Sequence, residues 1–330
     1  MTQLSELTAG TPKRQSSASS PLEVVASQLR WEAEGVVSLQ LRSRTGERLP
    51  RWEPGAHVDL ILPTGIERQY SLCGPVDDPS CYQLGVRRER TSRGGSEYVH
   101  AFLRPGQPLL LKGPRSNFGF RRAGSYLFIA GGIGITPILP MVRQAQSWGA
   151  DWQLLYGGHT ADSMPFLEEL REYGPRVRVF PADTVGRIPL TEVVAQVRPE
   201  LEIFACGPES LISALNEATA HWPAGSVHVE RFKSRPRVRS EDTPFEVVCA
   251  ASGRTVEVPA GRSILNALEE AGIRSAASCR SGLCGSCDTA VLDGVPDHRD
   301  EILSESDRAA GDRMFICVSR ARTPRLVLDL

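Results

Sequence analysis

The sequence predicts a multidomain protein with an antiparallel β-barrel, an α/β unit around a parallel sheet and a small α+β unit. Three observations predict it: short alternating apolar runs up to about residue 113, apolar runs alternating with helical patterns from Ser125 to Phe232, and a cysteine cluster in the last segment. A chain of 330 residues is long enough for two or three domains. We expect an N-terminal tail, three domains and a linker, over residues 1–20, 21–121, 122–232, 233–244 (linker) and 245–330.

Composition and charge exclude several classes of protein. Hydrophobic residues make up 41% and charged residues 23%, which is typical of globular domains and not of disordered or fibrous chains. The formal charge of -1 gives no general attraction to nucleic acid or to an anionic membrane. The sequence has neither an apolar run of ~20 residues nor the pattern of a signal peptide, so a cytoplasmic location is expected.

The first domain is expected to be a barrel of short strands. Gly and Pro separate its apolar runs, and one helix interrupts them from about Glu97 to Leu103. The predicted strands are LEVVASQLRW, GVVSLQLRS, HVDLILP, QYSLCG, YQLGVRR and PLLLKG. The tail before them, which ends in TPKRQSSASS, has no apolar period.

The two later domains follow different rhythms. The alternation of YLFIAGG, ITPILPMVRQAQ, WQLLYGG, PFLEELREY, VRVFPA, LEIFACG, PESLISALNEAT and VHVERF predicts βαβ units around a parallel sheet. The charged stretch KSRPRVRSEDTP contains two prolines and is typical of a linker. Beyond it, strands FEVVCA, RTVEVP and RLVLDL and a helix SILNALEEAG predict an α+β segment.

Four cysteines carry the most specific motif. Cys279, Cys284 and Cys287 follow the pattern Cys-x4-Cys-x2-Cys, and Cys317 lies further along the chain. This is the spacing of plant-type two-iron two-sulfur ferredoxins, in which each iron takes two thiolates. The Gly- and Ser-rich loop between the first three leaves backbone N–H groups available to the sulfurs. The sequence therefore predicts an iron–sulfur cluster.

Two other interpretations fit some of the cysteines. Cys284 and Cys287 alone could form half of a zinc site or a thioredoxin-like dithiol. A zinc ribbon needs a second close pair of cysteines, whereas Cys317 stands alone. A thioredoxin motif follows a strand in a βαβ unit, whereas this pair lies in a predicted loop. The iron–sulfur interpretation is favoured.

Two turns in the α/β domain indicate a nucleotide site. The run Gly131-Gly132-Ile133-Gly134-Ile135-Thr136-Pro137 connects an apolar strand to a helix, and Cys206-Gly207-Pro208 does the same further on. Glycines allow a pyrophosphate to approach the backbone at a helix N-terminus, and α/β sheets bind ligands at this edge. Such turns are also ordinary connectors, and Cys206 alone would more often be a small buried side chain.

A third constellation lies in the barrel. Arg68, Tyr70 and Ser71 lie together in one predicted strand, and Gly94, Gly95 and Ser96 open the predicted helix. An aromatic ring, a hydroxyl and a basic group can flank a planar heterocycle, while the glycines and Ser96 offer N–H groups to a phosphate. A surface strand followed by a capped helix explains the same residues equally well.

In this order, Arg-x-Tyr-Ser, Gly-Gly-x-Gly-x-Thr-Pro, Cys-Gly-Pro and the plant-type cysteine spacing resemble the phthalate dioxygenase reductase and vanillate demethylase reductase family. The resemblance spans about residues 22–330. It implies FMN on a six-stranded antiparallel barrel, a nicotinamide nucleotide on the α/β domain, and a β-grasp ferredoxin domain with a 2Fe-2S cluster. The cluster ligands would be Cys279, Cys284, Cys287 and Cys317.

The resemblance also implies roles for single residues. Arg68 would meet the flavin phosphate or ribityl chain, Tyr70 would pack on the isoalloxazine, and Ser71 would bond near N5. Gly94, Gly95 and Ser96 would hold the flavin phosphate. The cleft for the nicotinamide nucleotide would be lined by Gly132, Gly134, Thr136 and Pro137. Close to the nicotinamide itself would lie Cys206, Gly207 and Pro208. Phe232 matches the aromatic residue that covers the flavin.

Asp183, at the end of the predicted strand VRVFPAD, bears on the choice of nucleotide. A carboxylate there suits a ribose hydroxyl and repels a 2′-phosphate, which favours NADH over NADPH.

These patterns together predict an NADH-dependent iron–sulfur flavoprotein reductase, with Ser71, Cys206 and Phe232 at the reacting centre. It is expected to be a monomer that delivers electrons to a terminal oxygenase, a Rieske-type aromatic-ring dioxygenase or O-demethylase. A haem-thiolate monooxygenase is the alternative partner. A redox sensor without catalysis and a reductase that releases free flavin are the competing classes.

Overall fold

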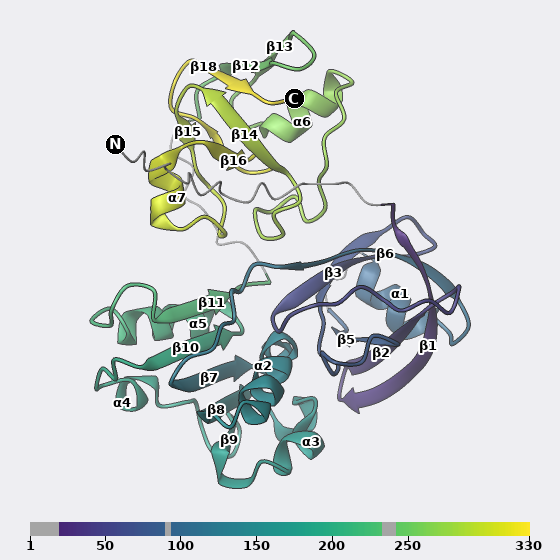
Figure 1. Ribbon diagram of the computed structural model, residues 1–330, viewed down its shortest axis with the longest axis vertical. Coiled ribbons are helices and arrows are strands. Elements are labelled where there is room, and N and C mark those ends of the chain that lie inside the picture. The colour runs from purple at the N-terminus through teal and green to yellow at the C-terminus, as the bar shows by residue number, and fades with distance from the viewer. Residues whose placement is uncertain (1–19, 90–93, 233–241) are drawn as a thin grey trace, which may run out of the picture.

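The computed structural model describes residues 20–89, 94–232 and 242–330, and these ranges fold around three main sheets (Figure 1). The predicted tail over residues 1–20 and the predicted linker over 233–244 lie almost entirely outside the described residues. The domain boundaries drawn from the sequence remain predictions. Each main sheet, with the helices packed on it, forms one body of the structure.

The first sheet is antiparallel and six-stranded within the described residues, in the order β4-β3-β6-β1-β2-β5. A bridge between Leu72 and Leu84, just beyond β4 and within β5, brings the two outer strands together and curls the sheet around an apolar core. The strands are β1 (Leu22–Ala33), β2 (Val36–Ser43), β3 (Ala56–Ile61), β4 (Glu67–Ser71), β5 (Tyr82–Arg87) and β6 (Pro108–Ser116). This curled antiparallel sheet confirms the predicted barrel fold.

The helix of this body, α1 (Gly95–Ala101), begins and ends two residues earlier than the sequence indicated. Gly94 takes a left-handed conformation, with φ of 89°, and so turns the chain into the helix before Glu97. At the other end, the N–H groups of Phe102 and Leu103 both donate to the carbonyl of Tyr98, which ends the regular helical pattern.

The second sheet is parallel, in the order β11-β10-β7-β8-β9. Its strands are β7 (Ser125–Gly131), β8 (Asp151–Gly158), β9 (Val177–Pro181), β10 (Leu201–Cys206) and β11 (Val227–Glu230), and its helices are α2 (Ile135–Ser147), α3 (Leu167–Arg171), α4 (Leu190–Val193) and α5 (Glu209–Ala218). Every residue of β7 is buried because apolar clusters cover both faces of the sheet. The strand order reverses between β7 and β10, the position at which open α/β sheets bind ligands.

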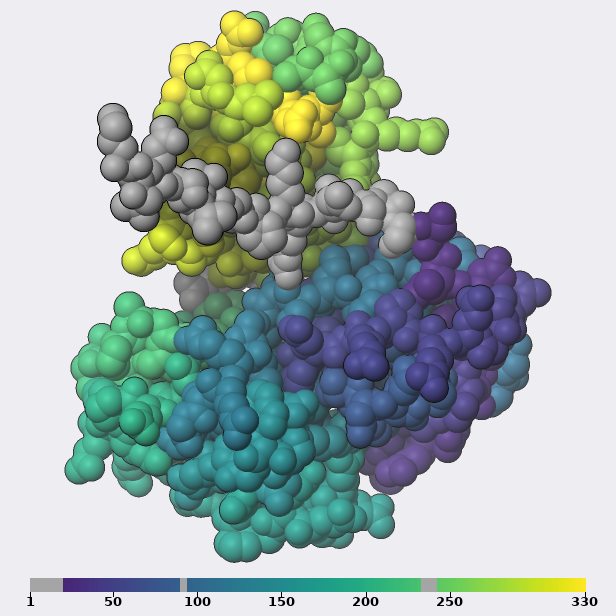
Figure 2. Space-filling view, in the orientation of Figure 1, coloured from purple at the N-terminus to yellow at the C-terminus, as the bar shows by residue number. Residues whose placement is uncertain are grey.

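The third sheet runs β13-β12-β18-β14-β16, with a small pair formed by β15 and β17. Its strands are β12 (Phe245–Cys249), β13 (Arg254–Val258), β14 (Asp288–Asp293), β15 (Pro296–Asp297), β16 (Arg313–Phe315), β17 (Arg320–Ala321) and β18 (Arg325–Leu328), and its helices are α6 (Ile264–Glu270) and α7 (Glu305–Ala310). The hydroxyl of Ser263 accepts from the N–H of Asn266 and caps α6. This body, green to yellow, is stacked on the other two in Figure 2.

Side chains of α2 join the parallel sheet to the barrel. Arg143 forms two hydrogen bonds with Glu169, of 2.7 and 2.8 Å, and donates to the carbonyl of Cys73 in the barrel at 2.6 Å. The methyl group of Thr136 lies where a side chain at Gly85 of β5 would be, 2.5 Å from an ideal Cβ. The start of α2 is therefore fixed against the barrel. No helix in the described ranges has the length and apolar character needed to cross a membrane.

The turn after β7 depends on one close backbone approach. A Cβ at Gly134 would lie 2.3 Å from the carbonyl oxygen of Cys206, at the end of β10. We expect Gly134→Ala to lower the free energy of unfolding by about 1–3 kcal/mol, because either the turn or the strand end must move. Urea denaturation measures the loss.

Gly157→Ala is the control for this substitution. Gly157 is the last but one residue of β8 in the same sheet, but a Cβ there would first meet the flexible end of Ile188, at 3.2 Å. Equal destabilisation by the two substitutions would contradict the explanation.

Candidate cofactor sites

The four predicted cluster cysteines lie together at one end of the third sheet. Three come from the loop before β14, and Cys317 follows β16. Their thiols contact one another in succession, from Cys284 to Cys279, from Cys279 to Cys317 and from Cys317 to Cys287. The loop reaches this arrangement through left-handed residues, Arg280 and two glycines, with φ between 55° and 76°.

Backbone donors surround the sulfurs. The N–H groups of Ser281 and Leu283 both donate to Cys279 Sγ at 3.4 Å, and the N–H of Ser286 donates to Cys284 Sγ at 3.5 Å. The Ser286 hydroxyl lies 3.0 Å from the same sulfur. Donors aimed at sulfur stabilise thiolates and the electron that a cluster gains on reduction. The loop therefore fits a thiolate-ligated cluster.

Charge balance points the same way. A hydrogen bond with Cys279 and then burial raise the pKa of the Cys284 thiol, so thiolates gathered here need cations to balance them. No group of three or more His, Cys, Asp or Glu side chains that could hold one metal ion was found in the described part of the chain. The successive contacts of the four thiols fit a two-iron cluster in which each iron takes two thiolates.

The two glycine-containing turns of the parallel sheet meet at the strand-order reversal. Beyond the contact of Gly134 with Cys206, a Cβ at Gly207 would lie 3.1 Å from Gly131 Cα, and one at Gly131 would lie 2.6 Å from Pro208 Cδ. The structure thus brings both turns, with Gly132, to one edge between β7 and β10. The motifs are adjacent in space although about seventy residues separate them in the sequence.

The other predicted nucleotide residues take different positions. Thr136 and Pro137 are buried in the first turn of α2, where the Thr136 hydroxyl donates to the carbonyl of Ile133 at 2.9 Å. The predicted strand end at Asp183 is wrong, since β9 ends at Pro181. Asp183 lies two residues beyond it, with an exposed side chain. β9 is one of the two edge strands of the sheet as described, and β8 separates it from β7.

Cys206 is fully buried at the end of β10, and burial, followed by the charge of Glu230, raises the pKa of its thiol well above the ordinary range. Its neighbour in register on β11 is Glu230. Burial alone raises the pKa of Glu230 to about 8, and its Oε2 is buried without a hydrogen-bond partner. Sequence reasoning missed Glu230, although it ends a parallel strand at the edge where ligands bind.

In the barrel, β4 and the start of α1 lie side by side. The Arg68 side chain occupies the space of a Cβ at Gly95, with Cγ at 2.5 Å and Nε at 2.9 Å. Ser96 accepts a hydrogen bond from the N–H of Glu89 at 3.1 Å. Arg68, Gly94, Gly95 and Ser96 are therefore brought together, with Tyr70 and Ser71 further along β4.

Tyr70 and Ser71 differ in their surroundings. Burial, partly offset by the charge of Arg68, raises the pKa of Tyr70 to about 12, so its hydroxyl stays protonated. Ser71 is 6% exposed and pairs directly with His57 of β3.

His57 is a second residue that the sequence analysis missed. Burial, and then the charge of Arg115, lower its pKa to about 3, and the imidazole lies against the main chain of Cys284. A lone histidine in a predicted strand gives no signal for such a position, because only the packing of the third body on the barrel creates it.

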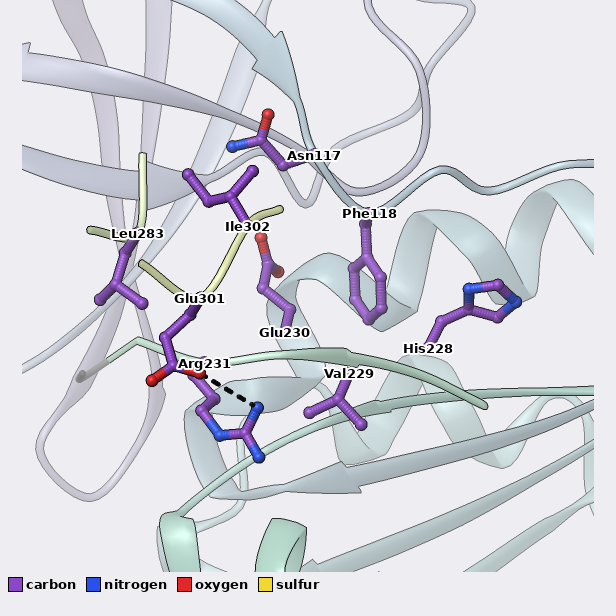
Figure 3. A pocket seen from close by; sticks show the side chains of 9 residues that line it. All are labelled: Asn117, Phe118, His228, Val229, Glu230, Arg231, Leu283, Glu301 and Ile302. Carbon is purple, nitrogen blue, oxygen red and sulfur yellow. Dashed lines mark ion pairs between the residues drawn. The ribbon is translucent and has the colours of Figure 1, made fainter. Parts of the chain in front are cut away.

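A cavity of about 150 Å³ marks the place where the three bodies meet (Figure 3). Asn117 and Phe118 line it from the chain after β6, residues 228–231 from β11 and its end, and Leu283, Glu301 and Ile302 from the third body. Arg231 donates to Glu209 at 3.1 Å, and its Nη1 lies 4.0 Å from Glu301. Phe232, the next residue, is 41% exposed.

Comparisons with known proteins bear on these sites. The family model for a 2Fe-2S iron-sulfur cluster binding domain matches residues 247–322, and that for an oxidoreductase NAD-binding domain matches 128–217. A putative toluene-4-sulfonate monooxygenase system reductase subunit from Comamonas testosteroni is 41% identical over 322 residues, which cover 95% of this chain and 100% of the relative.

Two solved structures are similar over 94% of this chain. A phthalate dioxygenase reductase is 35% identical with a TM-score of 0.69, and 98% of it is covered. An intact type IV self-sufficient cytochrome P450 monooxygenase is 40% identical with a TM-score of 0.89. This chain spans 41% of the length of that P450.

The carboxyl group of Glu230, whose Oε2 is buried, leads to a prediction about pH. Because its pKa is raised from 4.5 to about 8, the folded protein retains a proton that the unfolded chain loses, so stability falls as pH rises from about 4.5 to 8. The loss is at most ~1.4 kcal/mol per pH unit. We expect Glu230→Gln to remove this part of the pH dependence.

Urea denaturation between pH 5 and pH 8 measures it, with the exposed Glu246 of β12 as the site of a control substitution, Glu246→Gln. Identical slopes for the wild type and Glu230→Gln would show that the carboxyl is not protonated in the fold.

Proposed function

This chain belongs to the phthalate dioxygenase reductase and vanillate demethylase reductase family, and we propose that it is the NADH-dependent reductase of a two-component oxygenase. It is an oxidoreductase with an NAD-binding domain and a 2Fe-2S domain. The observation that carries the proposal is how three sites are connected: Ser71 of β4 pairs with His57, which lies against Cys284 of the cysteine loop, and the turn between β7 and α2 packs on β5 of the same barrel.

FMN is the proposed flavin. Arg68 against Gly95, with Gly94 and Ser96 beside them, supports a single phosphate at the start of α1. Tyr70 would pack on the ring, and Ser71 would donate a hydrogen bond near N5. Phe232, exposed and close to the junction, would cover the other face. A flavin bound there would supply the exchange between two-electron and one-electron chemistry, and a two-iron cluster on the four cysteines would supply one-electron transfer.

The chain's own residues orient these groups. Gly132, Gly134, Gly207 and Pro208 would admit the nucleotide backbone at the strand-order reversal, above the buried Thr136 and Pro137. Cys206, whose thiol is kept neutral by burial, would lie beside the nicotinamide without acting as an acid or a base. Cys279, Cys284, Cys287 and Cys317 would hold the irons. Positioning, rather than acid–base chemistry, is thus the work of the protein.

The partner is a terminal oxygenase, and we propose a Rieske-type aromatic-ring dioxygenase or O-demethylase. By their names, the relatives given above are a putative reductase subunit of a toluene-4-sulfonate monooxygenase system and a phthalate dioxygenase reductase, which supports an oxygenase as the partner. A haem-thiolate monooxygenase is the second candidate, because the similar self-sufficient P450 contains a comparable segment within one chain. A monomer in the cytoplasm is part of the same proposal.

The cluster gives the most direct test of the function. We expect Cys284→Ser to reduce NADH-dependent cytochrome c reduction at least tenfold, because electrons leave singly through the cluster, while anaerobic flavin bleaching by NADH stays within twofold of the wild type. The absorbance of cytochrome c and of the flavin, followed over time, gives the two rates. FMN, iron and sulfide are measured on the same sample. Cys81→Ser, in the barrel, is the control.

Equal survival of the two rates in Cys284→Ser would show that electrons do not leave through the cluster. A wild-type protein that binds zinc, or no flavin at all, would contradict the function itself.

Asp183 allows a test of nucleotide choice. If its carboxylate binds the ribose hydroxyls, Asp183→Ala should lower the NADH-to-NADPH ratio of kcat/KM about tenfold, which corresponds to ~1.4 kcal/mol. Steady-state kinetics with both nucleotides measure the ratio, and Glu192→Ala, on the exposed face of α4, is the control. An unchanged ratio would assign nucleotide choice to other residues.

A further inference from the structure

We propose that His57 is a positioning residue that couples the flavin edge of the barrel to the cluster loop. One ring nitrogen donates a hydrogen bond to the main-chain carbonyl of Cys284, and the other ring nitrogen forms a hydrogen bond with a polar atom of the bound flavin. The inference rests on the proposed function, because it takes Ser71 and Cys284 as neighbours of the flavin and the cluster.

The first observation is an unusual lack of partners. His57 is 2% exposed, yet neither ring nitrogen has a partner with full hydrogen-bond geometry among the described residues. A buried polar group left without a partner costs about 1–3 kcal/mol, so such groups are usually satisfied. A bound group at this position would complete the hydrogen bonding of the ring.

The second observation is where the ring lies. His57 is directly opposite Ser71 in the pairing of β3 with β4, so the two side chains leave the sheet on one face. The same ring lies against the main chain of Cys284, a predicted cluster ligand. One side chain therefore touches the cluster loop and neighbours the predicted flavin contact.

The third observation is that the nearby charged groups are engaged with each other. Arg115, the neighbour of His57 on β6, is paired with the fully buried Asp59 of β3. The register shifts by one residue between Lys112 and Arg115, a β-bulge that places the guanidinium beside this carboxylate. Asp59 and Arg115 pair with each other, which leaves the imidazole for the loop.

A second contact shows that the loop is seated on this part of the barrel. A Cβ at Gly285 would lie 3.6 Å from the amide nitrogen of Asn117, just after β6. His57 of β3 and Asn117, just after the neighbouring strand β6, thus meet consecutive residues of the cysteine loop. A shift of about 1 Å in such a contact is enough to slow a reaction strongly, so loosening it should slow transfer to the cluster.

The experiment uses the full-length protein with FMN and cluster bound, and compares the wild type with His57→Leu and His57→Asn. Leucine fills the space without a polar atom, whereas asparagine keeps a donor and an acceptor. Stopped-flow absorbance follows flavin reduction by NADH, and freeze-quench electron paramagnetic resonance follows the appearance of the reduced cluster. A dye titration gives the cluster midpoint potential.

We expect His57→Leu to leave flavin reduction within twofold of the wild type, to slow cluster reduction at least tenfold and to alter the resonance of the reduced cluster. His57→Asn should restore cluster reduction to within threefold. His100→Leu is the matched control, since it removes a barrel histidine whose ring bonds the carbonyl of Val86 at 2.9 Å.

Wild-type cluster reduction with an unchanged resonance in His57→Leu would overturn the proposal, as would Asn behaving like Leu with all cofactors present. If His57→Leu fails to retain its cofactors, His57→Ala is measured by the same resonance, and a wild-type spectrum and rate there would also overturn it. Failure of the proposed function is distinct, because it appears as missing FMN or iron in the wild type.

Discussion

Three sheet-based bodies pack around one junction, and the rest of the structure depends on this constraint. The barrel and the parallel sheet meet where Thr136 packs on Gly85 and Arg143 spans Cys73 and Glu169. Main-chain close approach and a paired guanidinium fix geometry more tightly than apolar contact alone. The start of α2, which carries the glycine turn, is thereby held in place relative to the barrel strands.

The third body is attached through more polar contacts. His57 and Asn117 of the barrel meet the cysteine loop, and Arg231 lies between Glu209 and Glu301. Glu301 in turn donates its N–H to the carbonyl of Gly282 within the cysteine loop. A small cavity remains between these contacts. Polar, imperfectly filled contacts of this kind resemble interfaces between domains rather than a single core, which is compatible with a ferredoxin domain that must also meet a partner.

Some of the buried polar groups without a hydrogen-bond partner lie in the elements that form this junction. His57, Asp59 and Glu230 each have a side-chain atom that is buried without a partner among the described residues. Such groups are costly in a core that serves only stability, so their presence at the three-body junction indicates that the surroundings are shaped for something besides packing. Burial also keeps Cys206 and Tyr70 in their neutral forms, which suits chemistry that moves electrons without a protein acid or base.

The sequence by itself determined the fold class, the four cysteines, the glycine turns and the family, because these depend on local periodicity and on spacing within short segments. Helix and strand ends were less certain: α1 starts early at the left-handed Gly94, and β9 stops short of Asp183. Only the tertiary structure placed His57 against the main chain of Cys284 and Glu230 beside Cys206, since the two residues of each pair come from different elements that are distant in the chain. Long-range contact has no periodic trace in sequence, and burial, which sets the protonation of both groups, exists only once the bodies are packed.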